Sequence, residues 1–198
     1  MKILFLHGLA SSGAYKMAST LRILLKGSEV LAPDIDIDPF KAFDELQGLC
    51  FAEEPDLIVG LSLGAFWAQK LRGWRKALVN PDFHPSRLLR ERLGENKYLS
   101  PRKDGAESFL VTEAIAKGYE SIEESEFEAL TPEERALTQG FFALGDEVVR
   151  CGPEFGLHYP GRARYYPGGH LPTFPEIKKW IVPNLELPPG LSAACGKF

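Results

Sequence analysis

The chain has 198 residues, of which 44% are hydrophobic and 25% are charged, and its formal net charge is −4. This length suits one domain, and the composition excludes disordered, collagen-like and long coiled-coil chains. The acidic balance argues against a nucleic-acid partner, and no apolar run reaches the ~18 residues that a membrane-spanning helix needs. The sequence therefore indicates a single globular domain.

Cysteine usage indicates the redox environment. Cys50, Cys151 and Cys195 are an odd number without CxxC spacing, so they form neither a zinc signature nor a disulfide framework. Proteins of reducing compartments use cysteine in this way. The short apolar start breaks at His7, too early for a signal peptide. We therefore expect a cytoplasmic protein.

Strands and helices are predicted to alternate over the first part of the chain. Short unbroken apolar runs are typical of strands that are buried on both faces of a parallel sheet. Four such strands are expected, at residues 3–6, 30–32, 57–59 and 77–79. Helices are expected between them, at about 15–26, from an Asp38 cap to about Cys50, and at about 63–72.

The alternation of predicted strands and helices stops between residues 86 and 138, where no strand is predicted. A short helix is expected at 86–93, and Thr131 with Glu134 forms the pattern of a capping box, which predicts another helix start. Basic residues gather in 87–103 and acidic ones in 104–135. We interpret residues 86–138 as a helical, cap-like insertion between two strands of the sheet.

Strand patterns return at residues 141–144 and 163–166, followed by a helix from Thr173 that Pro183 should end. The sequence therefore predicts an α/β fold, a doubly wound and mostly parallel sheet of about six strands. The single domain should span residues 1–183, and 184–198 should form a loose tail.

The most informative motif is Gly60-Leu61-Ser62-Leu63-Gly64, which matches G-x-S-x-G. In such a nucleophile elbow, a serine stands on a strained strand-to-helix turn, and the glycines on either side avoid collisions of Cβ atoms. A predicted strand precedes the motif and a predicted helix follows it, which is the required context. The alternative is a glycine-rich turn whose serine only caps the helix. We take Ser62 as the candidate nucleophile.

A nucleophilic serine needs a base. His170 follows the last predicted strand, and the chain order Ser, acid, His suits an elbow enzyme. His84 is the main rival and His158 a weaker one, while His7 is expected to support the loop in which it lies. His170 is therefore the candidate base.

The acid should come from the end of the strand that precedes the histidine. Asp146 has this position, and it would orient the imidazole and stabilise its charged form. Glu147 is adjacent but is expected to point elsewhere, and Asp82 is the fallback acid. The alternative role for Asp146 is capping of a turn.

The oxyanion of a tetrahedral intermediate needs preorganised N–H donors. Elbow enzymes take one donor from the residue after the nucleophile and one from a loop after an early strand. These rules assign the backbone N–H groups of Leu63 and Leu9.

Five segments occur in an order that resembles the α/β-hydrolase superfamily and, within it, the small YqiA/YcfP-like serine esterases. They are Leu4–Ser12, Gly60–Ala68, Asn80–Pro85, Gly145–Val149 and His170–Phe174. Ala65 stands where many members have glycine, and Pro172 lengthens the last segment. The resemblance implies ester or thioester hydrolysis through Ser62, Asp146 and His170.

We therefore expect a serine esterase or thioesterase that needs no cofactor or metal and acts on a small-molecule substrate through an acyl-enzyme. The alternatives are an acyltransferase or peptidase with the same triad, and a catalytically silent binding protein. Apolar residues of the insertion are candidates for the roof of an acyl pocket or for the insertion's own core: Phe109, Leu110, Ile115, Phe127 and Leu130. The basic cluster at 87–103 is either a solvated face or a site for an anionic leaving group such as coenzyme A.

Overall fold

Six parallel strands form the central sheet of the computed structural model, which describes residues 1–188. In spatial order they are β2 (Glu29–Leu31), β1 (Lys2–Leu6), β3 (Leu57–Leu61), β4 (Lys76–Val79), β7 (Thr138–Ala143) and β8 (Ala163–Tyr166). Every neighbouring pair is parallel. The predicted sheet of about six strands is confirmed.

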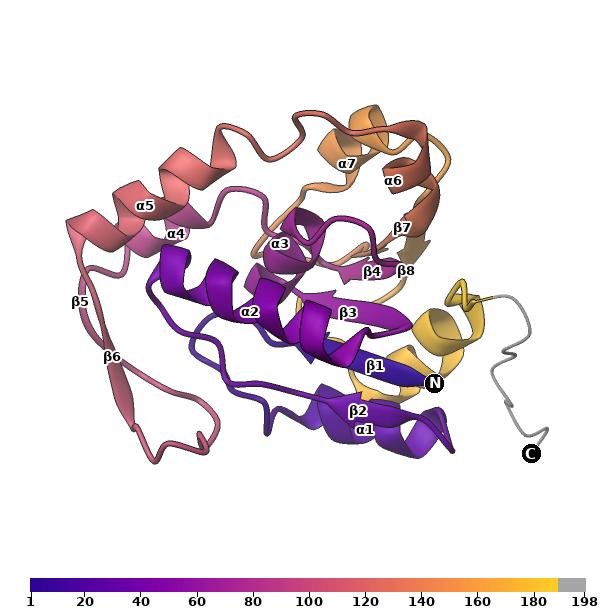
Figure 1. The fold of residues 1–198 in the computed structure, drawn as a ribbon, viewed down its shortest axis with the longest axis horizontal. Helices are drawn as coiled ribbons and strands as arrows, with labels where there is room; N and C mark the ends of the chain where they lie inside the picture. The colour runs from indigo at the N-terminus through magenta and orange to yellow at the C-terminus, as the bar shows by residue number, and fades with distance from the viewer. Residues whose placement is uncertain (189–198) are drawn as a thin grey trace.

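Helices cover both faces of this sheet (Figure 1). On one face lie α2 (Pro39–Glu53) and α3 (Leu63–Lys70), and on the other lie α1 (Lys16–Leu24) and the C-terminal turns. These turns are α8 (Phe174–Glu176), the π-helical η1 (Ile177–Ile181) and the 3₁₀ turn η2 (Val182–Asn184). Residues of β3, β4 and β7 are buried throughout, as expected for strands covered on two sides.

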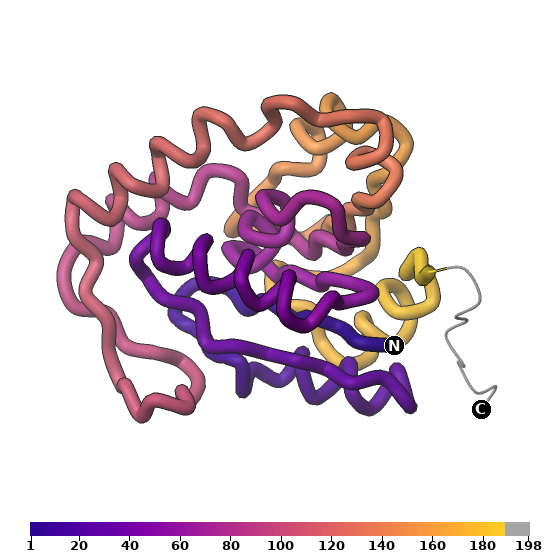
Figure 2. Tube along the Cα trace, in the orientation of Figure 1, coloured from indigo at the N-terminus to yellow at the C-terminus, as the bar shows by residue number. Residues whose placement is uncertain are grey.

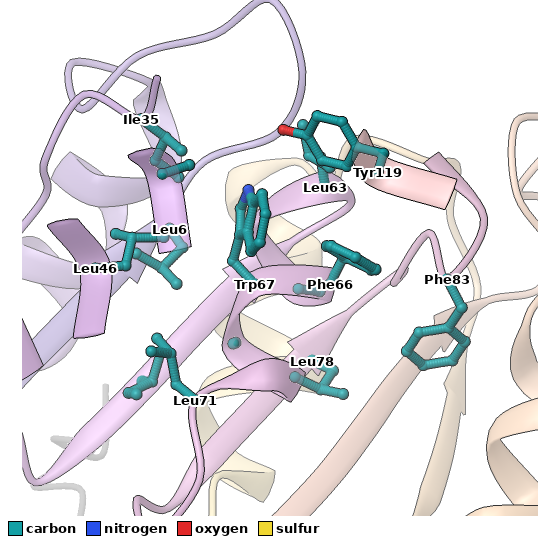
Figure 3. Packing of buried hydrophobic residues seen from close by; sticks show 14 of the residues in the cluster. Leu6, Ile35, Leu46, Leu63, Phe66, Trp67, Leu71, Leu78, Phe83 and Tyr119 are labelled. Atoms are coloured by element: carbon teal, nitrogen blue, oxygen red, sulfur yellow. The ribbon is translucent and has the colours of Figure 1, made fainter. Parts of the chain in front are cut away.

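Aromatic packing fixes α3, the helix that follows Ser62. Phe66 and Trp67 meet edge to face with ring centroids 4.9 Å apart, and Tyr119 lies 5.4 Å from Trp67 (Figure 3). Tyr119 belongs to α5 (Glu113–Glu123), so the insertion contributes to the main core. Large buried aromatic side chains of this kind dominate core energetics and leave α3 little freedom to move.

The insertion between residues 86 and 138 is not purely helical, and the prediction that it lacks strands is wrong. It contains α4 (Pro85–Arg90), α5 and α6 (Pro132–Leu137), but also an antiparallel pair, β5 (Gly94–Lys97) and β6 (Ser108–Val111). Figure 2 shows this hairpin at one end of the molecule, with α5 running back along the outside. The turn of the hairpin is attached to the loop after β1, because Leu99 N–H donates to Ala10 O at 2.7 Å.

Local capping signals match the structure with one difference. Asp38 accepts hydrogen bonds from the N–H groups of Phe40 and Lys41, each at 3.0 Å, and starts α2 as predicted. The capping box at Thr173 is complete. The one at Thr131 is half formed, because the Glu134 carboxylate binds the Lys76 ammonium at 3.1 Å instead of the cap. The Lys76 ammonium is buried, and a buried charge without a partner of opposite sign strongly destabilises the fold. The Glu134 carboxylate therefore pairs with Lys76 and not with the backbone N–H of the cap.

The segment after Asn184 is packed where the structure describes it. Leu185 is buried, and the Glu186 carboxylate pairs with Arg162 at 2.5 Å. The sequence predicts a loose tail from residue 184, but these two residues are packed against the domain. Residues 189–198, which hold the rest of the predicted tail and Cys195, lie outside the described part. Among the helices of residues 1–188, none combines the length and the apolar character needed to cross a membrane.

Candidate active site

The loops that follow β1, β3, β4, β7 and β8 meet at the carboxyl edge of the sheet, because all of these strands run in the same direction. The chain leaves β1 toward β2 on one side and later enters β3 on the other side. Open parallel sheets bind ligands in the crevice at such a reversal. Ser62 follows β3 directly and therefore lies at this point.

Ser62 occupies the strained turn that the motif predicts. Its φ is 55° and its ψ is −120°, and α3 begins at the next residue. A Cβ atom on Gly64 would lie 2.1 Å from the Leu6 carbonyl oxygen, and one on Gly60 would lie 2.4 Å from that of Gly64. Both positions therefore exclude any larger residue, and the close contacts hold the turn against the end of β1.

Three residues at this edge of the sheet have strained backbone conformations. Ala10, Ser62 and Asn80 all have positive φ, at 57°, 55° and 44°, in the loops after β1, β3 and β4. Each such residue costs about 1–3 kcal/mol and persists only where the surrounding structure enforces it. Strain of this kind is typical of functional sites.

His170 connects the other two predicted side chains. Its Nδ1 lies 2.8 Å from Asp146 Oδ2, and its Nε2 lies 2.9 Å from Ser62 Oγ. An ionised carboxylate can only accept, so Nδ1–H donates to Asp146 and Nε2 is left to accept the Ser62 hydroxyl proton. The three candidates, which come from loops after β3, β7 and β8, thus form one continuous hydrogen-bonded chain.

Asp146 is held in its charged form. Burial alone would raise the pKa of this carboxyl, but the hydrogen bond from His170 and those from the N–H groups of Val149 and Val148 outweigh it and lower the pKa. The two backbone donors lie 3.0 Å and 2.8 Å from Oδ1. The Asp146 carboxylate is therefore fixed by its own turn while its second oxygen faces the imidazole.

The rival residues have other partners. His84 is exposed and its Nε2 lies 3.0 Å from Glu154 Oε2, while His158 stacks on Phe127 with ring centroids 3.8 Å apart. Asp82 is buried near His170, and its Oδ1 accepts the His84 N–H at 3.0 Å. Burial raises the pKa of Asp82, so this carboxyl is less suited than Asp146 to stabilise a charged imidazole.

His7 supports the loop after β1, as the sequence predicts. His7 is 4% exposed, and its Nδ1–H donates to Gly8 O at 2.8 Å while its Nε2 accepts the Ile35 N–H at 3.0 Å. Burial lowers the pKa of His7 to about 4, so the ring stays neutral and can serve both partners. Both nitrogens are occupied within the protein, which leaves neither for catalysis.

The predicted oxyanion donors are the backbone N–H groups of Leu63 and Leu9, which come from the turns after β3 and β1. Leu63 is the first residue of α3, so its N–H has no acceptor in the helix, and Leu9 follows Gly8, whose Cβ would lie 3.3 Å from Ser62 Cβ. Within residues 1–188, neither N–H donates a hydrogen bond. Leu9 lines the cavity at Ser62, and Leu9 and Leu63 both line a smaller cavity next to it.

Asn80 is a polar residue at this site for which the sequence analysis predicts no role. It follows β4 and is 1% exposed. Its Nδ2 donates to His170 O at 2.7 Å and to Tyr166 OH at 2.9 Å, and its Oδ1 accepts the Ala143 N–H at 2.8 Å. One amide thus ties the loop of the candidate base to the strand that leads to the candidate acid.

We expect Asn80→Asp to lower kcat for a test ester about tenfold to a hundredfold with little change in KM. Aspartate tolerates positive φ and keeps the acceptor for Ala143, but it removes the two donors that hold the His170 loop. A displacement of about 1 Å at the base is sufficient for such a loss. Steady-state kinetics measures the effects on kcat and KM separately, and Asn184→Asp, at an exposed position, is the matched control. An unchanged kcat in folded protein would contradict the positioning role.

A cavity of about 220 Å³ opens over Ser62 and His170. Apolar side chains dominate its lining, and two of them, Leu88 and Leu99, come from the insertion. The apolar residues that the sequence offered as a roof are elsewhere: Phe109, Ile115, Phe127 and Leu130 pack into the core, and Leu110 is exposed. Within residues 1–188, no group of three or more His, Cys, Asp and Glu side chains is placed to hold a metal ion.

Comparison with known proteins identifies the family and the fold. The model of the "Uncharacterised protein family (UPF0227)" matches residues 2–133, and no curated protein matches the chain. A monoacylglycerol lipase from Paleococcus ferrophilus is 9% identical with a TM-score of 0.57, covering 85% of this chain and 84% of its own. The fold is therefore that of the α/β hydrolases, as the resemblance implied.

Two further solved structures share the fold. An extracellular α/β-hydrolase from a Paenibacillus species is 13% identical with a TM-score of 0.52 and covers 91% of this chain and 94% of its own. The esterase domain of a Rhodothermus marinus protein is 20% identical with a TM-score of 0.51, and the match covers 85% of this chain and 76% of the Rhodothermus chain. This chain thus corresponds to most of each of these proteins.

Proposed function

The chain belongs to family UPF0227, and we propose that it is a serine hydrolase that cleaves carboxylic esters or thioesters. One observation carries the proposal, namely the hydrogen-bonded chain from Ser62 Oγ through His170 to Asp146. The hydrolase fold and the lipases and esterases that share it agree with this chemistry. The roles of the individual residues follow from general acid–base catalysis.

Acylation begins when His170 Nε2 accepts the Ser62 proton and Oγ attacks the carbonyl carbon. The oxyanion that forms is held by the N–H groups of Leu9 and Leu63, which donate to no other group within residues 1–188. Asp146 stabilises the imidazolium. His170 then gives the proton to the leaving alcohol or thiol, and the acyl group stays on Ser62.

Deacylation repeats these steps with water. His170 takes a proton from water, the resulting oxygen nucleophile attacks the acyl carbon, and a second tetrahedral intermediate uses the same two donors. Collapse of this intermediate returns the proton to Ser62 Oγ and releases the carboxylic acid. Both half-reactions use only side chains and backbone groups of this chain.

The cavity supports a small, mostly apolar acyl group. Leu88, Leu99, Val148 and Leu171 surround the space next to Ser62 and His170. Its volume of about 220 Å³ suits short acyl chains better than long ones. Short-chain esters are therefore the first substrates to test.

A panel of p-nitrophenyl esters and acyl thioesters of increasing chain length tests the proposal. We expect turnover to fall beyond short chains, with free acid as the product even when an added alcohol or amine competes with water. Transfer of the acyl group to the added alcohol would support the rival acyltransferase, and cleavage of peptides instead of esters would support a peptidase. Absence of turnover on every substrate would favour a silent binding protein.

A further inference from the structure

Arg92 is the basic residue of segment 87–103 that lines the cavity holding Ser62 and His170. The other arginines of the segment are engaged or placed elsewhere. Arg90 pairs with Glu120, and Arg102 pairs with Asp104 at 2.9 Å. Arg87 lines a neighbouring cavity with Asp82 and His84. Among the arginines of this segment, Arg92 is thus the one that lines the cavity at Ser62.

Among residues 1–188, the guanidinium of Arg92 has no hydrogen-bonding or ionic partner. Within the described part of the chain it forms no ion pair, and its side chain donates no hydrogen bond to another residue. Its backbone is fixed, because its N–H donates to Leu89 O at 3.0 Å and Leu89 is fully buried. The backbone therefore holds Arg92 beside the cavity, and its exposed side chain is not engaged by another residue of the described part.

No carboxylate lies among the residues that line this cavity. Apart from His170, its only ionic side chain is that of Arg92, and most of the remaining lining is apolar. The apolar lining lowers the dielectric constant on the cavity side of Arg92, which strengthens its attraction for an anion there, while its exposed side stays subject to screening by solvent and salt. Arginine also presents a planar set of donors that matches a carboxylate or a phosphate.

We propose that Arg92 forms an anion subsite and selects esters that carry a carboxylate or phosphate group close to the scissile bond. This inference rests on the proposed ester hydrolysis at Ser62 and adds a substrate class to it. The anionic group can belong to the acyl part or to the alcohol part of the ester. The same guanidinium serves either orientation, and matched substrates distinguish the two.

Two pairs of esters test the subsite. For the acyl side, 4-nitrophenyl butyrate is compared with mono-4-nitrophenyl glutarate. For the alcohol side, methyl 4-(butanoyloxy)benzoate is compared with 4-(butanoyloxy)benzoate. The measured quantity is the ratio of kcat/KM for the anionic ester to that for its neutral partner, in the wild type and in Arg92→Gln.

We expect Arg92→Gln to lower this ratio by about tenfold or more in at least one pair, since a charge-assisted hydrogen bond is lost. The pair that responds identifies the side that carries the anion. Arg92→Lys should lose less, because it keeps the charge but not the planar fork. Added salt should lower the wild-type ratio, since the guanidinium is exposed to screening.

Arg87→Gln is the matched control, because it removes the same charge from an exposed arginine of the same segment outside the Ser62 cavity. It should leave both ratios within about twofold of the wild type. The subsite is rejected if Arg92→Gln changes neither ratio, or if Arg87→Gln changes them as much. Hydrolysis of the neutral esters reports separately on the proposed function, and its absence together with absence of anionic turnover would reject both.

Discussion

Ser62→Ala is expected to lower kcat for hydrolysis of 4-nitrophenyl butyrate by at least ~10³-fold. Within residues 1–188, Ser62 Oγ is the one hydroxyl hydrogen-bonded to His170, at 2.9 Å, and no other hydroxyl or thiol there is hydrogen-bonded to a histidine. Removal of one oxygen leaves the cavity and the two oxyanion donors in place. The rate that remains should therefore be the slow attack of water on a bound ester.

The fold should survive this change. Ser62 Oγ makes no hydrogen bond in residues 1–188 other than that to His170, and the main-chain bonds of the elbow do not involve the side chain. The exposed Ser19→Ala in α1 is the matched control and should retain full activity. Equal activity of Ser62→Ala and the wild type, in protein with a native circular dichroism spectrum, would exclude Ser62 as the nucleophile.

His170→Ala should lose activity to a similar extent, at least ~10³-fold, because the serine then has no base. His84→Ala is the matched control: its ring is exposed and interacts with Glu154, so its loss should change kcat/KM by less than about twofold. Steady-state hydrolysis of the same ester measures both variants. The reverse pattern would move the base to His84.

The double variant gives a sharper test of the shared role. Residues that act as one catalytic unit are strongly non-additive, so Ser62→Ala combined with His170→Ala should be no slower than either single variant by more than a few-fold. Independent contributions would instead multiply the two losses. Additive behaviour would contradict the proposal that the hydroxyl and the imidazole act in one step.

The strands of the sheet were predictable where they contain short apolar or aromatic runs, and β7 was predicted three residues late, at 141–144, because it begins with Thr138, Gln139 and Gly140. β8 was predicted with its observed limits, Ala163–Tyr166. The β5–β6 hairpin was missed because β5 consists of Gly-Glu-Asn-Lys, residues with low strand propensity. Backbone hydrogen bonds to β6 hold β5 in its extended conformation. Such pairing with another segment leaves no pattern in the sequence of β5 itself.

The site was predictable to the extent that strand ends determine it. Ser62, Asp146 and His170 each follow a strand, and parallel strands bring such positions to one edge. The role of Asn80 was not predictable, because its side chain joins loops that are distant in sequence. The apolar residues of the insertion were ambiguous for a similar reason, since core and cavity positions share the same composition.

Covalent labelling tests the central claim most directly. The protein is treated with a fluorophosphonate, and the adduct is located by mass spectrometry of the intact chain and of its peptides. A serine activated by His170 should take up one phosphonyl group per chain, on Ser62, and both Ser62→Ala and His170→Ala should abolish it. An unlabelled wild-type protein, or an adduct on another residue, would contradict the account.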